Sequence, residues 1–368
     1  MGFYIPGFET ELKQHLNLSA ATWLVVEEDI KNFSNGAKYN LAGFLNRIFL
    51  NFYQDAEATI SQRILKRNEE LSKIFSAKEF KSMDKKITEV HIKKILDAYK
   101  KELITKATNY QKGQAIKFRI NKENVEILRE SEEKEYYKDT IGLYLKAIFE
   151  EYATKPMYER EMIYFKNIVD DIQSAISQKK KIKLSILKRI NPDSHEFYTR
   201  KFYISPYKII NDKARMFNYV VGYSEESMPD GSLAPKMAAC YRISRIERLS
   251  IISSAGGFIS KADQNAIEKM IAEKGPQFLA GEVIEIKVKF TDKGIENFHS
   301  QLYMRPSDYE KADGEENTYI FMCTEFQALN YFFKFGRDAE ILSPQNTRDK
   351  FIKRYKDAYE QYINNEEK

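Results

Sequence analysis

The chain has 368 residues, which is enough for two or three domains that each bury a core of their own. A hydrophobic share of 43%, a charged share of 31%, and only 15 glycines and 9 prolines exclude a collagen-like repeat, a membrane bundle and a wholly disordered chain. The net charge is only +5, but residues 61–130 carry 18 basic and 10 acidic groups and residues 179–250 carry 15 and 7, so we expect two basic surfaces that attract polyanions. The first basic segment also fits a solvated helix face without a partner.

The first third of the chain contains two copies of one small unit. We expect each copy to be a strand followed by two helices, at residues 22–26, 27–34 and 40–58 for the first, and at 116–120, 121–130 and 140–152 for the second. The segment GFLNRIFLNFY at 43–53 matches GLYLKAIFEEY at 142–152 without a gap, which indicates an internal repeat. Lysine-rich helices within 61–112 are expected to form an arm or a connector between the copies.

Each copy, about 20–60 and 114–153, resembles the ribbon-helix-helix family, in which two strands pair as an antiparallel ribbon that lies in the DNA major groove. One copy alone cannot complete its sheet, so the resemblance implies pairing, either between the two copies or between two chains. Aligning the expected strands turns Thr22, Leu24, Lys117 and Arg119 outward. Lys117 and Arg119 suit contacts with phosphates or guanine, whereas Thr22 and Leu24 carry no charge. The ribbon is therefore either a nucleic-acid surface or a device for dimerisation or docking.

From residue 181 the apolar period changes from that of a helix to that of a strand, as Ile182, Leu184 and Ile186 alternate with polar residues. The next apolar runs predict a small β-barrel, with further strands at 197–210, 216–223, 241–243 and 245–252. The run ISPYKIINDKARMFNYVVGYS and the later CYRISRIERL resemble the WYL domain, an Sm-like or SH3-like barrel that recognises ligands or nucleic acids in bacterial regulators. In the triplet that names this family, Asn218-Tyr219-Val220 stands where Trp-Tyr-Leu is usual.

Cations and aromatic rings are interleaved on these strands, as Arg200, Lys201, Arg242, Arg245 and Arg248 with Tyr203, Tyr207, Tyr219, Tyr223 and Tyr241. Such a surface suits single-stranded nucleic acid, because unpaired bases stack on rings while guanidinium groups hold the phosphates. The WYL resemblance places the family's basic pocket at Arg200, Tyr219, Arg242 and Arg245. We therefore expect nucleic acid to contact Arg200, Lys201, Tyr219, Tyr223, Arg242 and Arg245, together with Lys117 and Arg119 on the ribbon. In the alternative interpretation the tyrosines belong to the barrel core and Arg245 pairs with an acid across the sheet.

The last third alternates helices and strands, at 260–274, 283–290, 293–302, 317–323, 325–335 and 339–342. A final helix is expected after Ser343 as its N-cap and Pro344 as its first residue. The run FFKFGRDAEILSP resembles the C-terminal extension behind WYL domains, which implies a module for dimerisation, so its phenylalanines are predicted to be core or interface. The expected fold is α+β and multidomain: a helical region at 1–165, a WYL domain at 166–255 and the extension at 256–368.

The sequence contains no phosphate-binding loop, dinucleotide-binding, nucleophile-elbow or zincin motif, so we expect a protein that binds rather than catalyses. Two cysteines and four scattered histidines predict no disulfide framework, no metal and no cofactor. No window approaches a membrane span and the N-terminus has no leader pattern, so we expect a cytoplasmic protein without a membrane partner.

The order of these domains is similar to that of the WYL accessory proteins of type VI-D CRISPR systems. The resemblance implies a homodimer that binds single-stranded RNA and enhances an RNA-guided RNA nuclease. Two alternatives stay open: a transcription regulator that binds duplex DNA through the ribbon and senses a ligand through the barrel, and a scaffold that binds neither. Loss of RNA binding in Arg242→Ala would favour the accessory protein, and loss of operator binding on replacing Lys117 and Arg119 would favour the regulator.

Overall fold

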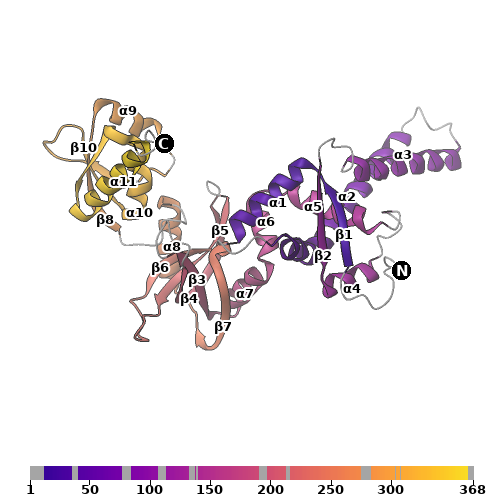
Figure 1. The fold of residues 1–368 in the computed structure, drawn as a ribbon, viewed down its shortest axis with the longest axis horizontal. Helices are drawn as coiled ribbons and strands as arrows, with labels where there is room; N and C mark the ends of the chain where they lie inside the picture. The colour runs from indigo at the N-terminus through magenta and orange to yellow at the C-terminus, as the bar shows by residue number, and fades with distance from the viewer. Residues whose placement is uncertain are drawn as a thin grey trace. The chain divides into compact units, whose positions relative to one another are not determined.

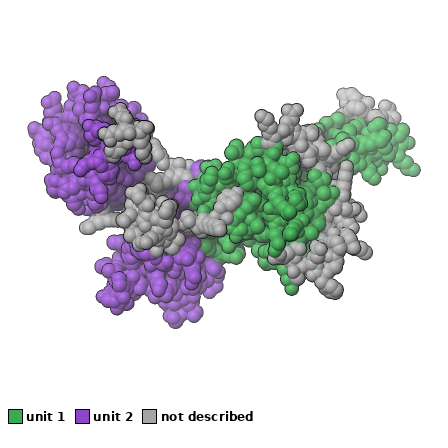
Figure 2. All heavy atoms as spheres, viewed as in Figure 1, with its two compact units in different colours: residues 1–169 green, residues 170–368 purple. Residues whose placement is uncertain are grey.

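The computed structural model describes residues 12–34, 40–76, 84–106, 113–131, 137, 140–189, 197–212, 216–274, 283–302, 304–306 and 308–363. The chain forms two compact units, residues 1–169 and 170–368, which are coloured separately in Figure 2. Helices and antiparallel sheets occur in both, so the expected α+β class is confirmed at that level. None of the described helices is long and apolar enough to cross a membrane.

The first unit is built around a two-stranded antiparallel sheet of β1 and β2, which lie side by side in Figure 1. Each strand forms one half of the unit together with the two helices that follow it. The long second helix of the first half leads to α3, which precedes the second half. The elements in chain order are β1 (Leu12–Leu18), α1 (Ala20–Phe33), α2 (Leu41–Phe75), α3 (Lys85–Lys106), β2 (Gln114–Ile120), α4 (Lys122–Glu130), α5 (Ile141–Thr154) and α6 (Met157–Tyr164). The next helix, α7 (Lys166–Ser177), includes the boundary between residues 169 and 170. The repeated segments 43–53 and 142–152 lie in α2 and α5.

The prediction of a strand at residues 22–26 is wrong, because this segment lies inside α1. Ser19 caps the helix by accepting a hydrogen bond from the backbone N–H of Thr22, and this cap outweighs the β propensity of the segment. The strand that pairs with β2 is instead β1, in which buried or half-buried residues alternate with exposed ones. Both strands therefore belong to one chain, and the ribbon forms between its two halves.

The two halves interlock, since the second helix of each half packs against the strand and the first helix of the other half. Polar contacts fix both junctions. Asn46 of α2 accepts a hydrogen bond from the backbone N–H of Asn121 and donates one to the carbonyl of Arg119. Glu150 of α5 accepts hydrogen bonds from the backbone N–H and the hydroxyl of Ser19, both at 2.9 Å. Neither half can be removed without leaving buried polar groups of the other half without partners.

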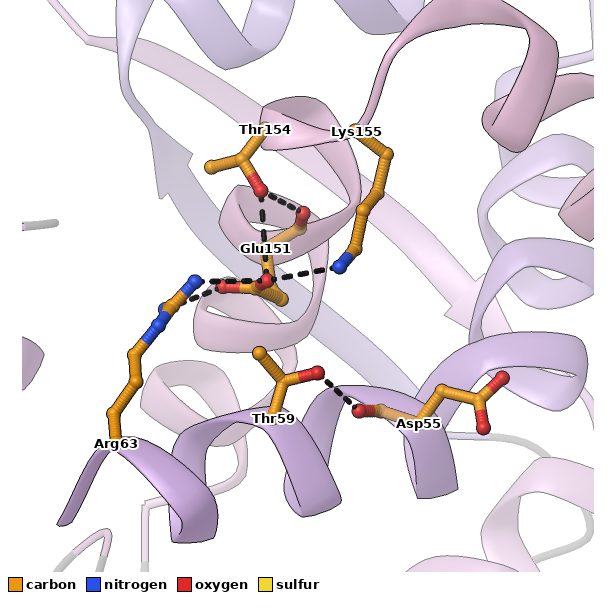
Figure 3. A network of polar contacts seen from close by, with 6 residues as sticks. All are labelled: Asp55, Thr59, Arg63, Glu151, Thr154 and Lys155. Atoms are coloured by element: carbon orange, nitrogen blue, oxygen red, sulfur yellow. Dashed lines mark hydrogen bonds and ion pairs between the residues drawn. The ribbon is translucent and has the colours of Figure 1, made fainter. Parts of the chain in front are cut away.

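A second network joins α2 directly to α5 and is drawn in Figure 3. The guanidinium of Arg63 binds both carboxylate oxygens of Glu151, at 2.7 and 3.1 Å, and Lys155 lies 3.5 Å from the same carboxylate. The side chain of Glu151 is only 4% exposed, so these cations compensate a carboxylate that is withdrawn from water.

The second unit begins with a five-stranded antiparallel sheet in the order β6-β5-β4-β3-β7. Its strands are β3 (Lys180–Arg189), β4 (Phe197–Asp212), β5 (Phe217–Glu226), β6 (Met237–Arg242) and β7 (Ile246–Gly256). The apolar side chains of one face are buried, among them Ile182, Leu184, Phe202, Ile204 and Val220. Pairing between β6 and β7, which would close the expected barrel, is not found among the described strands.

Close approach of β4 and β5 depends on one glycine. The pairing register shifts between Pro206 and Lys208, and at this bulge a Cβ atom on Gly222 would lie 2.1 Å from the carbonyl oxygen of Ser205. No side chain fits in that space, so glycine is required where β4 and β5 approach each other at the bulge.

The C-terminal part has its own aromatic core, to which Phe290, Phe298, Phe321, Phe332 and Phe335 contribute. It contains a four-stranded sheet in the order β11-β8-β10-β9. The elements from the end of the first sheet onward are α8 (Lys261–Lys274), β8 (Val283–Phe290), α9 (Asp292–Ser300), β9 (Tyr309–Lys311), β10 (Thr318–Thr324), α10 (Glu325–Tyr331), β11 (Ala339–Ser343) and α11 (Gln345–Ile363). Phe333 stacks on Tyr355 of α11 at 4.7 Å between ring centroids, so the phenylalanine-rich run is core, as the sequence predicts.

Candidate nucleic-acid interface

The residues that the sequence assigns to one basic pocket lie on both faces of the five-stranded sheet. Arg200 of β4 forms a bidentate ion pair with Glu226 of β5, and its guanidinium carbon lies 5.2 Å from the ring centroid of Phe202. The hydrogen bonds with Glu226 raise the pKa of Arg200 above its ordinary value. The charge of Arg200 is therefore balanced within the sheet.

Arg242 and Tyr219 are directly opposite each other on β6 and β5, on the other face. The guanidinium carbon of Arg242 lies 3.1 Å from the ring centroid of Phe217, and its Nε donates to the Ser244 hydroxyl at 2.6 Å. Tyr219 is only 7% exposed and packs with Val221 and with Ile267 of α8. Both residues thus make intramolecular contacts that the sequence does not reveal.

Helix α8 covers the part of this face that carries most of the tyrosines. Glu268 accepts hydrogen bonds from the Tyr207 hydroxyl at 2.8 Å and from Lys208 at 2.7 and 2.8 Å. These bonds hold the pKa of Glu268 below its ordinary value of 4.5. Burial and the neighbouring Asp263 raise the pKa of Tyr223. Helix α8 therefore places the carboxylates of Glu268 and Asp263 on a face for which the sequence alone predicts binding of polyanions.

Two residues of the expected middle site are exposed. Lys201 lies on β4, and Arg245 lies in the short 3₁₀ helix at Ile243–Arg245 between β6 and β7. Because Arg200 lies on the opposite face from Tyr219 and Arg242, the six expected residues form no single pocket in the described part of the sheet.

The ribbon of the first unit has an exposed basic face. Lys117 and Arg119 of β2 are exposed, as expected from the alternation in that strand. Because the first strand is β1, the residues opposite them are His15 and Lys13, and both are exposed. Thr22 is buried in α1 and Leu24 is exposed on it, so neither belongs to the ribbon. The sequence did contain a signal for β1: in LKQHLNL, Leu12, Leu16 and Leu18 are separated by even numbers of positions, which places them on one face of a strand.

Comparison with solved structures finds the same fold over nearly the whole chain. A protein described as "Crystal structure of a CRISPR Cas-related protein" superposes with a TM-score of 0.66 and 24% sequence identity, over 98% of this chain and 96% of that one. The proteasome accessory factor B/C of Arthrobacter aurescens matches with a TM-score of only 0.22 and 12% identity, over 51% of this chain and 26% of that one, which is too low to indicate a shared fold. No protein-family model matches, and no curated protein matches.

Proposed function

We propose that this protein is a homodimeric, single-stranded-RNA-binding accessory protein that enhances a type VI-D CRISPR RNA-guided RNA nuclease and has no enzymatic activity of its own. The observation that carries the proposal is the likeness of fold, over 98% of the chain, to a protein described as CRISPR Cas-related. The exposed cations on strands support the RNA-binding part, because binding of a phosphate backbone is dominated by cationic side chains. The WYL-like sequence runs in the five-stranded sheet and the ribbon-helix-helix-like order of the first unit agree with it.

The test of this proposal has two parts. Fluorescence polarisation with an unstructured RNA, a matched single-stranded DNA and a duplex DNA across a salt series is expected to show the tightest, salt-sensitive binding to RNA. A cleavage assay with a type VI-D nuclease, its guide and a target RNA is expected to run faster with the protein than without it. Failure to bind RNA, or binding without any effect on cleavage, would contradict the proposal.

A second candidate function is a transcription regulator that places the ribbon in duplex DNA. The specific observation in its favour is the exposed face on which Lys13 is opposite Arg119 and His15 is opposite Lys117. Cationic and hydrogen-bonding side chains on a two-stranded ribbon suit the major groove. Tighter binding to duplex DNA than to RNA, lost in a variant with Lys13, Lys117 and Arg119 replaced by alanine, would establish this function instead.

A further inference from the structure

Three cations and one tyrosine share an open face of the five-stranded sheet, outside the area that α8 covers. In the antiparallel register, Ser185 of β3 is opposite both Lys201 of β4 and Arg248 of β7. Lys183, which is two residues before Ser185 on β3, is opposite Tyr203 of β4. Residues that are paired directly across antiparallel strands point to the same face, so the side chains of Lys183, Lys201, Tyr203 and Arg248 project together. We call these four residues the cation row.

The spacing of the cation row follows from the sheet. Neighbouring strands are about 4.8 Å apart, so Lys201 and Arg248, two strands apart, are separated by roughly 10 Å at the backbone. Lys183 is the diagonal neighbour of both, at roughly 7–8 Å. Lys201 and Arg248 are exposed, and Lys183 is half-buried with its ammonium 5.6 Å from the ring centroid of Tyr203. The row thus presents three positive charges on one face of the sheet, one of which, Lys183, lies over the ring of Tyr203.

These three cations keep their charge uncompensated as far as the described residues extend. Neither Lys183, Lys201 nor Arg248 forms an ion pair there, in contrast to Arg200 and Lys208 on the same strands. Two carboxylates lie beside the row, and one of them, Glu225 of β5, is directly opposite Tyr203, but both have other contacts. Glu225 pairs with Lys181 at 2.6 Å, and an oxygen of Glu247 lies 3.5 Å from the Thr199 hydroxyl.

We propose that the cation row binds a single strand of RNA, with Lys183, Lys201 and Arg248 on successive phosphates and Tyr203 stacked on an unpaired base. The inference rests on the proposed function and names the site at which it would act. A flat ring between cations can stack only on a base whose face is accessible, and a duplex hides the faces of its bases inside the stack. The ring face of Tyr203 that the Lys183 ammonium approaches becomes available to a base when that ammonium moves to a phosphate.

The test compares charge-matched variants by fluorescence polarisation with the unstructured RNA across a salt series. Each phosphate contact on a single strand contributes about 0.7 to the slope of log K against log salt, so replacing Lys183, Lys201 and Arg248 by alanine is expected to lower the slope by about 2. Replacing Lys289, Lys293 and Lys353, which are exposed in the C-terminal part, removes the same charge and is expected to leave the slope unchanged.

Stacking is tested separately at the ring. Tyr203→Leu is expected to weaken RNA binding by roughly 5- to 150-fold, which corresponds to the range for loss of one base–aromatic stack, and Tyr203→Phe is expected to retain the affinity of the native protein. An unfolding midpoint of Tyr203→Leu equal to that of the native protein shows that its loss of affinity is not caused by misfolding.

The outcomes separate this inference from the proposed function. If the native protein binds RNA and the cation-row variant binds with the same slope, the cation row is not the site and the proposed function stands. If RNA binding is lost only when Lys13, Lys117 and Arg119 of the ribbon are replaced, the RNA lies on the ribbon and the inference is overturned. If the native protein does not bind RNA, the proposed function fails and the inference fails with it.

Discussion

The guanidinium of Arg160 in α6 forms a bidentate ion pair with the carboxylate of Asp29 in α1, with Nε 2.6 Å from Oδ2 and Nη2 2.9 Å from Oδ1. Tyr152 of α5 donates its hydroxyl to the same carboxylate at 2.7 Å. Asp29 is fully buried, so three helices from the two halves of the first unit meet at one charge that has no access to water.

Asp29→Ala is expected to destabilise the first unit by about 3–5 kcal/mol, because it leaves the Arg160 guanidinium buried without its counter-charge. Urea unfolding of the full chain measures the loss. Glu27→Ala, which removes the exposed pair with Lys31, is the matched control and should change the free energy of unfolding by no more than about 0.5 kcal/mol. Equal effects of the two substitutions would show that the buried cluster adds no stability.

Asn46→Ala is expected to cost about 1–3 kcal/mol, since it removes the acceptor of the Asn121 N–H and the donor to the Arg119 carbonyl at a buried junction. Thermal unfolding of the full chain is the measurement. Gln54→Ala, on the same helix with only a contact to Tyr53 at the surface, serves as the control. A stability loss no greater than that of Gln54→Ala would mean that the junction between the halves tolerates the missing bonds.

Gly222→Ala is expected to destabilise the five-stranded sheet by roughly 1–3 kcal/mol, because the new methyl group meets the Ser205 carbonyl and forces β4 and β5 apart. Gly256→Ala, where no atom lies within 4 Å of the added carbon, is expected to be close to neutral. The measurement is the urea midpoint of unfolding of each variant, compared with that of the native protein. If the two midpoints coincide, the bulge at Pro206 has relaxed to accept a side chain.

The contact between α8 and the sheet is expected to weaken in acid. The hydrogen bonds from Lys208 and Tyr207 hold the pKa of Glu268 below 4.5, so the folded state favours the ionised carboxylate. The stability that this preference contributes is present above the unfolded pKa of about 4.5 and is lost as the pH falls through the lower, folded pKa. Unfolding of native protein and Glu268→Gln at pH 7, 5 and 3.5 should therefore show a difference that shrinks toward the lowest pH. The control Glu296→Gln, at an exposed position, should show no such trend.

Arg242→Ala is expected to reduce RNA affinity less than replacement of the cation row, because the Arg242 guanidinium is already stacked on Phe217 and bonded to Ser244. Fluorescence polarisation with the unstructured RNA compares the two variants directly. Complete loss of binding in Arg242→Ala alone, with unchanged thermal stability, would instead restore Arg242 to the centre of the site.

Local patterns predicted much of the fold. Residues 116–120 alternate strictly, and Asn121 precedes the helix α4 that it caps, so strand and helix were both recognisable from the sequence. The prediction for residues 22–26 was wrong because Thr and Val favour strands in isolation. In the structure the backbone N–H of Thr22 donates to the Ser19 cap, and its hydroxyl donates to Glu150, which is 128 residues away.

The candidate site was less predictable for the same physical reason. A cation is available to a ligand only if no carboxylate of the same protein reaches it, and such partners are distant in sequence. Arg200 is paired with Glu226 and Lys208 with Glu268, whereas Lys201, next to Arg200, is exposed on the opposite face of the sheet. Neighbours in sequence thus differ completely in what they can bind, and only the pairing of strands separates them.

Formation of the ribbon within one chain also sets its symmetry. In a ribbon made by two identical chains, each side chain recurs across a two-fold axis and the matching target is palindromic. Here His15 faces Lys117 and Asn17 faces Ala115, so the two edges of the ribbon are chemically different. The ribbon also forms at any protein concentration, because its strands are covalently joined. In the second candidate function, in which the ribbon binds duplex DNA, a surface of this kind would distinguish the two directions of a strand and would not require an inverted repeat in its target.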